Sequence, residues 1–459
     1  MQSKDTEQLG TLSVGKLLVK LSLPAITAQL INMLYNLVDR IYIGNMGDEG
    51  MLALTGMGVC LPVIMLVSAF AALVSMGAAS RASIFLGRGD VASAEKTMGN
   101  STTLLFLISI TLTILVQIFA EPLLMMFGAS EKTIGYALDY LRIYSMGTLF
   151  VQFTLGLNSF ITAQGFSKTS MLTVVIGAVI NIALDPLFIF TFGMGVRGAA
   201  LATIISQCVS MIWILHFLTG KRTTLRIRRE CLKIDWHVIG PCVALGLSPF
   251  IMQSTESLLN ICFNSSLLKY GGDLAVAAMT VLSSVMQFAM LPLTGLTQGA
   301  QPIVSYNYGA RNAQRVRAAF RMLLMSCVTY STLLWGGVML FPEGFVRLFN
   351  SDAELISFAS HALRIYMAAG LILGVQLSCQ QTFIALGNAK SSLFLALLRK
   401  IILLIPLIYI LPAFMADKTT AVFLAEPVAD VLAVTATALL FRQQFGRAMR
   451  AIEEAPVKA

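Results

Sequence analysis

Four polar side chains in the N-terminal half of the sequence have the chemistry to bind a small cation. Asn181 and Asp185 are four residues apart, which places them one turn apart on the same face of a helix. Asp39 and Thr203 lie in two other apolar stretches of the same half. Two carboxylates, an amide and a hydroxyl supply hard oxygen ligands. They suit a Na⁺ ion, or one proton shared by the two acids, provided that the helices bring them to one level.

Each of the two acids also has a structural interpretation. Asp185 precedes Pro186 and could mark a helix end, and Asp39 could pair with its neighbour Arg40. Other site chemistries find no support in the sequence. The seven cysteines and three histidines show no C-x-x-C pair or metal-ligand spacing, which argues against iron–sulfur, zinc and haem sites. No nucleotide-binding motif is present, so we predict no cofactor and do not expect ATP to be the energy source.

Polar residues at helical spacing form two matching stripes, one in each half of the sequence. The first has spacings of three, four and three residues and comprises Gln29, Asn32, Asn36 and Asp39. The second has spacings of three, four and four and comprises Gln253, Glu256, Asn260 and Asn264. Polar groups at membrane depth are costly and usually face a cavity or a polar partner. We predict that these residues, except Asp39 and Asn264, line a substrate cavity together with Gln287. Hydrogen bonding between helices of a dry bundle is the alternative.

Composition indicates the environment of these residues. The chain has 459 residues, of which 57% are hydrophobic and 12% are charged, about half the charged share of a typical soluble domain. Its mean hydropathy is +0.79. Residues 51–80 and 274–310 contain no charged side chain, and about 20 apolar residues suffice to cross the hydrocarbon. These features exclude a soluble globule, a disordered chain and a disulfide scaffold. They predict an all-α integral membrane protein, embedded in a lipid bilayer.

Twelve membrane-spanning helices are expected when the apolar stretches are divided at charges and at Gly or Pro turns. Their predicted bounds are 17–43, 51–78, 97–120, 134–158, 169–190, 196–218, 237–267, 274–303, 318–341, 357–385, 391–413 and 419–441. The N-terminus, every second loop and the C-terminal tail hold 22 of the 32 Lys and Arg residues, the other loops six and the spans four. The positive-inside rule therefore places both termini in the cytoplasm. The basic run 221–233 is interpreted as a topology signal and lipid-facing linker, and not as a nucleic-acid site.

The two halves of the sequence repeat each other at an offset of 222 residues. Between 141–170 and 363–392, 10 of 30 aligned positions are identical. Gly87 and Gly309 are equivalent at the same offset. An even number of spans in each repeat gives both halves the same orientation, so they should be related by an axis along the membrane normal and share a cavity. The predicted organisation is an N-terminal six-helix lobe at 1–218, a basic cytoplasmic linker at 219–236 and a C-terminal six-helix lobe with a cytoplasmic tail at 237–459.

Charged residues also occur within the last two predicted spans. Glu426 and Asp430 are four residues apart on one of them, and Arg399 and Lys400 lie at comparable depth on the other. Opposite charges inside a membrane are expected to pair with each other. We therefore predict a structural ion pair of Asp430 with Arg399 or Lys400.

Several segments of the sequence resemble a known family of transporters. They are Leu23-Pro24-Ala25, the segment 35–44 (YNLVDRIYIG), the segment 193–203 (GMGVRGAALAT) and the segment 426–430 (EPVAD). Over nearly the whole chain, the sequence is similar to the multidrug and toxic compound extrusion (MATE) family, particularly its bacterial MepA-type branch. The resemblance implies twelve spans in two lobes. It also implies an antiporter of the bacterial plasma (inner) membrane that expels organic cations in exchange for Na⁺ or H⁺.

The resemblance also implies roles for particular residues. The family's cation site in the N-terminal lobe matches Asp39, Asn181, Asp185 and Thr203. Glu256 resembles a cation-linked glutamate on the seventh helix of some members. The acid that some members carry on the tenth helix is missing, because that span offers only Gln376, Gln380 and Gln381. This favours H⁺ over Na⁺ as the coupling ion and leaves both open.

The expected function is cation-coupled antiport of lipophilic organic cations by alternating access between two lobes. We expect a monomer that acts on small molecules and binds no nucleic acid or nucleotide. Two alternatives remain. A lipid-linked precursor flippase shares the two-lobe design, but its anionic pyrophosphate cargo would require several Lys or Arg in the cavity. A membrane-embedded enzyme would require carboxylate repeats or clusters of His and Cys at helix ends.

The distribution of charge predicts the topology, which thiol labelling can test. In a variant without the seven native cysteines, Arg228→Cys should react with a membrane-impermeant thiol reagent only after the cells are permeabilised. Lys269→Cys, in a loop predicted to be external, should react in intact cells and is the matched control. Labelling of the cysteine at position 228 in intact cells would overturn the predicted orientation.

Overall fold

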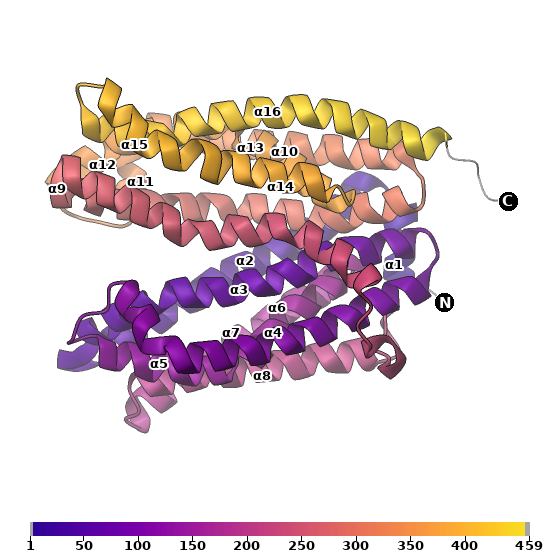
Figure 1. The fold of residues 1–459 in the computed structure, drawn as a ribbon, viewed down its shortest axis with the longest axis horizontal. Helices are drawn as coiled ribbons and strands as arrows, with labels where there is room; N and C mark the ends of the chain where they lie inside the picture. Colours follow the sequence, from indigo (N-terminus) through magenta and orange to yellow (C-terminus); the bar gives the residue numbers. More distant parts are fainter. Residues whose placement is uncertain (1–2, 455–459) are drawn as a thin grey trace.

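The computed structural model describes residues 3–454, and within this range the chain forms helices and no β-strand (Figure 1). The helices of the N-terminal half are α1 (Lys4–Thr11), α2 (Val14–Gly44), η1 (Gly47–Glu49), α3 (Gly50–Gly87), α4 (Val91–Met126), α5 (Ile134–Met146), α6 (Thr148–Ala163), α7 (Ser167–Pro186), η2 (Leu187–Thr191) and α8 (Val196–Thr219). The linker contains η3 (Arg229–Leu232). The helices of the C-terminal half are α9 (Trp236–Gly309), α10 (Ala313–Leu340), α11 (Pro342–Arg347), α12 (Ala353–Tyr366), η4 (Gly370–Ile372), α13 (Leu373–Ala385), α14 (Ala389–Leu397), η5 (Leu398–Leu404), α15 (Ile405–Phe414) and α16 (Lys418–Glu454).

These helices are consistent with the twelve predicted spans. Within residues 3–454, nine helices are long and apolar enough to cross a membrane, and α12 with α13 form a further crossing that is bent by 49°. Helix α9 has 74 residues and a non-helical residue, Gly272 (φ 67°), so its two arms account for the seventh and eighth spans. Helices α5 and α6, which meet at Gly147, cover the predicted span 134–158.

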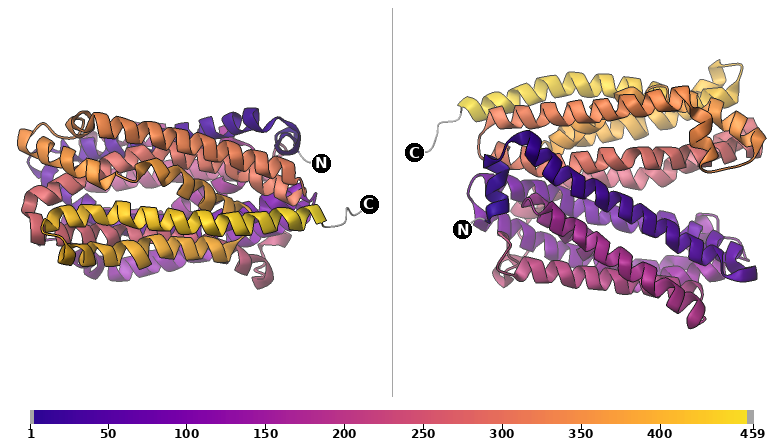
Figure 2. Two further views of the ribbon diagram at one scale, coloured as in Figure 1. Left: turned by 90° about the horizontal axis from the view of Figure 1, so that it is seen from above. Right: turned by 180° about the vertical axis from the view of Figure 1, so that it is seen from behind.

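The helices form two bundles that lie side by side, α2–α8 in one lobe and α9–α16 in the other (Figures 1 and 2). Each lobe has its own apolar core. In the N-terminal lobe, buried residues such as Met57 and Leu141 pack together, and in the C-terminal lobe Phe263, Leu282 and Phe423 do so. Burial of apolar side chains within each lobe holds its helices together. Further apolar clusters join the lobes, such as Leu17 and Leu21 with Leu293 and Ile303. The predicted all-α membrane fold of two lobes is confirmed, and the described helices are consistent with six spans in each lobe.

The lobes touch where glycines allow the backbones of α3 and α9 to meet. A Cβ atom on Gly246 would lie 1.7 Å from the carbonyl oxygen of Leu73. Gly87 and Gly309, which the internal repeat makes equivalent, pack against each other's helices. A Cβ on Gly87 would lie 1.9 Å from the Tyr306 carbonyl oxygen, and a Cβ on Gly309 would clash in the same way with α3. Any side chain at these positions would force the two helices apart.

Helix α1 contacts both lobes at the end of the molecule where Gly87 of α3 and Gly309 of α9 meet. The Thr6 hydroxyl donates a hydrogen bond to the Gln164 carbonyl oxygen, just beyond α6, at 3.0 Å. From the other lobe, the Arg315 guanidinium on α10 donates to the carbonyl oxygens of Leu9 and Leu12 at 3.1 and 2.6 Å. The N-terminal segment therefore ties the lobes together close to the contact between α3 and α9.

The linker between the lobes packs against the start of α4. Arg228 pairs with Glu95 at 2.7 Å, and Lys96 pairs with Asp235 at 2.7 Å. The hydrogen bond from the Lys96 ammonium holds the pKa of the Asp235 carboxyl below its ordinary value. The basic side chains of the linker are exposed, but residues 223–225 are buried. The linker is therefore anchored to the N-terminal lobe, and does not simply face lipid as its charge pattern suggested.

The close approach of α3 and α9 allows the contact between the lobes to be tested by substitution. Gly246→Ala should separate the lobes at this end, because the new methyl group meets backbone that cannot move aside cheaply. Disulfide formation between Ser80→Cys and Gln301→Cys, whose native side chains hydrogen-bond across the lobes, should slow at least several-fold. Gly240→Ala is the control, since no heavy atom lies within 4 Å of its Cβ. If the disulfide forms at the same rate in the Gly246→Ala and Gly240→Ala backgrounds, the contact between the lobes is contradicted.

Candidate functional site

The four residues of the predicted cation site lie together in the N-terminal lobe. Asp39 comes from α2, Asn181 and Asp185 from α7 and Thr203 from α8, and none is more than 8% exposed. The Asn181 amide donates to Asp185 Oδ1 at 3.2 Å and to Thr203 Oγ1 at 3.5 Å. Asp39 is close enough to Asp185 for the two carboxylates to interact electrostatically. Packing of three helices thus assembles the two acids, the amide and the hydroxyl at one level.

The backbone around this cluster departs from a regular α-helix. Helix α7 ends at Pro186, which has no N–H to donate, and continues into the π-helical turn η2. Asp185 is therefore both a helix-end residue and a member of the cluster. At the other acid, Asp39 is buried and its neighbour Arg40 is exposed. Their side chains point in different directions, because consecutive residues of an α-helix are about 100° apart around its axis.

Three oxygens of the cluster have no hydrogen-bond partner among the described residues. They are Asp39 Oδ1, Asn181 Oδ1 and Asp185 Oδ2. A buried polar group without a partner costs on the order of 1–3 kcal/mol, and a charged one costs more. A monovalent cation between these oxygens, or a proton on one of the acids, would remove much of that cost. Asp39, Asn181, Asp185 and Thr203 are the residues that would hold it.

Tyrosines of α2 and α5 lie near the cluster, and the sequence analysis missed them. Tyr140 of α5 is 3% exposed and interacts electrostatically with Asp39, and the partly buried Tyr35 of α2 interacts electrostatically with both acids. The rings of Tyr140 and Tyr144 stack with their centroids 6.1 Å apart. A signal was present, since Tyr136, Tyr140 and Tyr144 recur every four residues and therefore share one helix face.

A central cavity of about 460 Å³ lies between the lobes, lined by α2, α3, α6, α7 and α9. Sixteen of its 26 lining residues carry a hydroxyl or an amide, and within this lining, all of it in the described range, no side chain is charged or aromatic. Asn158 Oδ1 and Ser167 Oγ, both in the lining, have no hydrogen-bond partner among the described residues. The cavity is therefore lined mostly by neutral hydrogen-bonding side chains, two of which carry a buried atom without a partner.

The predicted cavity residues divide into two groups in the structure. Gln29, Asn32 and Gln253 line the central cavity. The other four are exposed and lie outside its lining: Asn36, Glu256, Asn260 and Gln287. All four lie on the same helix faces as lining residues: Asn36 is one turn beyond Asn32, Glu256 and Asn260 are one and two turns beyond Gln253, and Gln287 is two turns before Thr294. Gln29 also donates to Gln298 at 3.1 Å, which joins amides from the two lobes.

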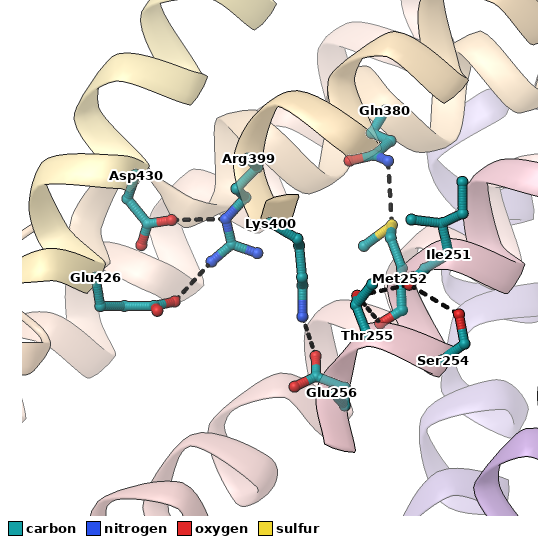
Figure 3. Close-up of polar contacts among 10 residues, drawn as sticks. All are labelled: Ile251, Met252, Ser254, Thr255, Glu256, Gln380, Arg399, Lys400, Glu426 and Asp430. Atoms are coloured by element: carbon teal, nitrogen blue, oxygen red, sulfur yellow. Dashed lines mark hydrogen bonds and ion pairs between the residues drawn. The ribbon is translucent and has the colours of Figure 1, made fainter. Parts of the chain in front are cut away.

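Five charged side chains form a second polar centre, in the C-terminal lobe (Figure 3). Arg399 Nε lies 2.7 Å from Asp430 Oδ1, and Arg399 Nη2 lies 3.1 Å from Glu426 Oε1. Lys400 pairs with Glu256 of α9. The expected ion pair of Arg399 with Asp430 is present, but Lys400 does not join it. The side chains of consecutive helical residues diverge, so Arg399 points to α16 and Lys400 to α9 (Figure 3).

The tenth span supplies a neutral hydrogen-bond network in place of an acid. The Gln376 amide donates to Gln380 Oε1 at 3.3 Å and accepts from the Thr437 hydroxyl at 2.7 Å. Gln380 in turn donates to the Ser248 hydroxyl at 3.1 Å. In the part of the chain that the structure describes, no group of three or more His, Cys, Asp or Glu residues could hold a metal ion.

An integral membrane bundle of two repeated lobes, with a polar cavity between them and buried ionisable groups beside it, is the architecture of a membrane transporter. Comparison with known families agrees with this class. The model of the MatE family matches residues 24–187 and 249–410. The chain belongs to this family of membrane transporters, as the resemblance of its sequence motifs implied.

Individual relatives resemble the chain over almost its entire length. Multidrug export protein MepA of Staphylococcus haemolyticus is 24% identical over 424 residues, which cover 92% of this chain and 93% of that protein. An FAD transporter of Shewanella oneidensis is 25% identical over 442 residues, or 94% of each chain. A solved multidrug resistance MATE family transporter of the MOP superfamily, in an outward-facing conformation, has the same fold. It gives a TM-score of 0.91 at 24% identity and covers 98% of this chain and 99% of that one.

Proposed function

We propose that the protein is a multidrug antiporter that exports lipophilic organic cations in exchange for H⁺ or Na⁺. The observation that carries the proposal is the set of three buried oxygens without partners at Asp39, Asn181 and Asp185. A site of this kind gains stability when a cation or proton enters it. Helices α2 and α7, which supply these residues, also line the central cavity. A change at the cation site can therefore change the cavity through the same two helices.

Cation binding at the Asp39–Asp185 cluster and substrate binding in the cavity are expected to weaken each other. When the cation is bound, the packing of α2 and α7 changes and substrate binding in the cavity weakens. Because binding free energies are reciprocal, the substrate must weaken cation binding by the same factor. Exchange of one for the other is what antiport requires, and neither step needs a nucleotide.

The contact between the lobes supports an outward-facing state. Along their helices, Gly87 and Gly309 come one turn after the cavity residues Ser83 and Ser305. The contact therefore lies between the cavity and the end of the molecule that carries the linker. If that end is cytoplasmic, as the charge distribution predicts, the cavity is closed to the cytoplasm. Transport would then require the α3–α9 contact to separate and the opposite ends of the lobes to approach.

The charges in and near the central cavity favour cationic substrates over anionic ones. The relatives include a multidrug export protein and an FAD transporter, and FAD carries negative phosphates. The lining of the cavity, which lies within residues 3–454, contains no Lys or Arg to hold a phosphate. Glu256 lies on the helix face of Gln253 and is the acid available to a ligand near the cavity. The same absence of lining cations argues against a flippase for lipid-linked pyrophosphates.

Neutralising either acid of the cation site should abolish coupled efflux. Asp39→Asn and Asp185→Asn keep the size of the side chain but remove the charge that captures the cation, so dye efflux under an ion gradient should fall at least tenfold. Asp139→Asn is the matched control, because Asp139 forms an exposed surface pair with Arg197 at 3.0 Å that contributes little. Efflux at the wild-type rate in either site variant, at equal expression, would contradict the proposed site.

The coupling ion should be H⁺. Two acids in a partly dry site repel each other when both are charged, which favours one shared proton. Purified protein in liposomes should extrude a dye when only a pH gradient is imposed, with no Na⁺ present. A strict requirement for Na⁺, with no response to the pH gradient, would contradict H⁺ coupling and leave the antiporter proposal standing.

A further inference from the structure

Glu256 and Lys400 are joined by an ion pair whose two members have very different exposure. The Lys400 side chain is 7% exposed and the Glu256 side chain is 49% exposed. Glu256 is one turn beyond Gln253, which lines the central cavity, and on the same helix face. Lys400 contacts the Glu256 carboxylate from within the lobe (Figure 3), and about half of the Glu256 side chain remains exposed.

The charges of this centre do not balance. Glu256, Glu426 and Asp430 are three acids, and Arg399 and Lys400 are two bases. With all five ionised, the centre lacks one positive charge. Both acids of α16 are at most 9% exposed and share one guanidinium, so the unmatched charge has little access to water inside the lobe. One monovalent cation bound at the open side of Glu256 would make the centre neutral.

Lys400 also has a second acid available. Glu426 interacts electrostatically with Lys400 as well as with Arg399. If Lys400 leaves Glu256, its ammonium can move toward Glu426 and remain paired. The π-helical turn η5, which carries both bases, provides a wider backbone in which such a shift is feasible.

We propose that Glu256 binds the charged group of a monovalent organic cation, and that Lys400 is a tethered cation which this substrate displaces. The proposal rests on the function proposed above and adds the step by which the substrate is recognised. Lys400 occupies Glu256 in the absence of substrate, which avoids an unpaired acid within the membrane. A neutral compound of the same shape cannot take the place of the ammonium, so the exchange selects for charge.

Binding of ethidium to the purified full-length protein, measured by fluorescence anisotropy at constant ionic strength, tests this exchange. Lys400→Gln should tighten binding about tenfold, because the competitor is removed and Glu256, being half exposed, stays hydrated. Lys400→Arg retains a competing cation and should stay within about twofold of the wild type. Glu256→Gln should weaken binding. The double variant Glu256→Gln/Lys400→Gln should match Glu256→Gln alone, because Lys400 acts through Glu256.

Two results would overturn the proposal. One is Lys400→Gln binding that is equal to or weaker than that of the wild type. The other is tightening that persists in the double variant. Lys400→Met keeps the aliphatic stem in its buried position and repeats the test if the glutamine variant folds poorly. If the wild type exports dye under an ion gradient but Lys400→Gln does not change ethidium affinity, only this inference is contradicted. A wild type that binds no ethidium contradicts both this inference and the proposed substrate class.

Discussion

A charged side chain inside a lipid-surrounded bundle is stable only if something neutralises it, and the two lobes meet this constraint in opposite ways. In the C-terminal lobe, Arg399 and Lys400 are built-in cations that pair with the acids of α9 and α16. In the N-terminal lobe, Asp39 and Asp185 have no basic partner in the cluster and leave oxygens unpaired. The first arrangement is nearly complete within the protein. The second would be stabilised by a cation or proton from outside, as the proposed coupling site requires.

This difference is built on a common scaffold. Gly87 and Gly309 are equivalent in the internal repeat and pack against each other's helices where the lobes meet. The fifth and eleventh spans each contain a π-helical turn, η2 and η5, but at different positions, since η5 corresponds to residues 176–182 at the 222-residue offset. The helices and their contact thus follow the repeat, while the ionisable residues do not. Two lobes built on one repeated frame therefore carry different chemistry.

The fold could be predicted from the sequence because long apolar stretches and a repeat constrain it strongly. The cluster of Asp39, Asn181, Asp185 and Thr203 could also be proposed from depth along the predicted spans, since each span fixes how far a residue lies from the membrane surface. Depth along a span does not determine how each helix is rotated about its own axis relative to its neighbours. For that reason the sequence indicated that Lys400 would be paired but not that Glu256 is its partner.

The central claim is that the Asp39–Asp185 site and the substrate site exclude each other through α2 and α7. The most direct measurement is the dissociation constant of ethidium for the purified protein over a series of pH values and Na⁺ concentrations, in the wild type and in Asp185→Asn. We expect the coupling ion to weaken ethidium binding in the wild type, and the dependence to disappear in the variant. An ethidium affinity that depends on neither ion, or a dependence that is unchanged in Asp185→Asn, would contradict the claim.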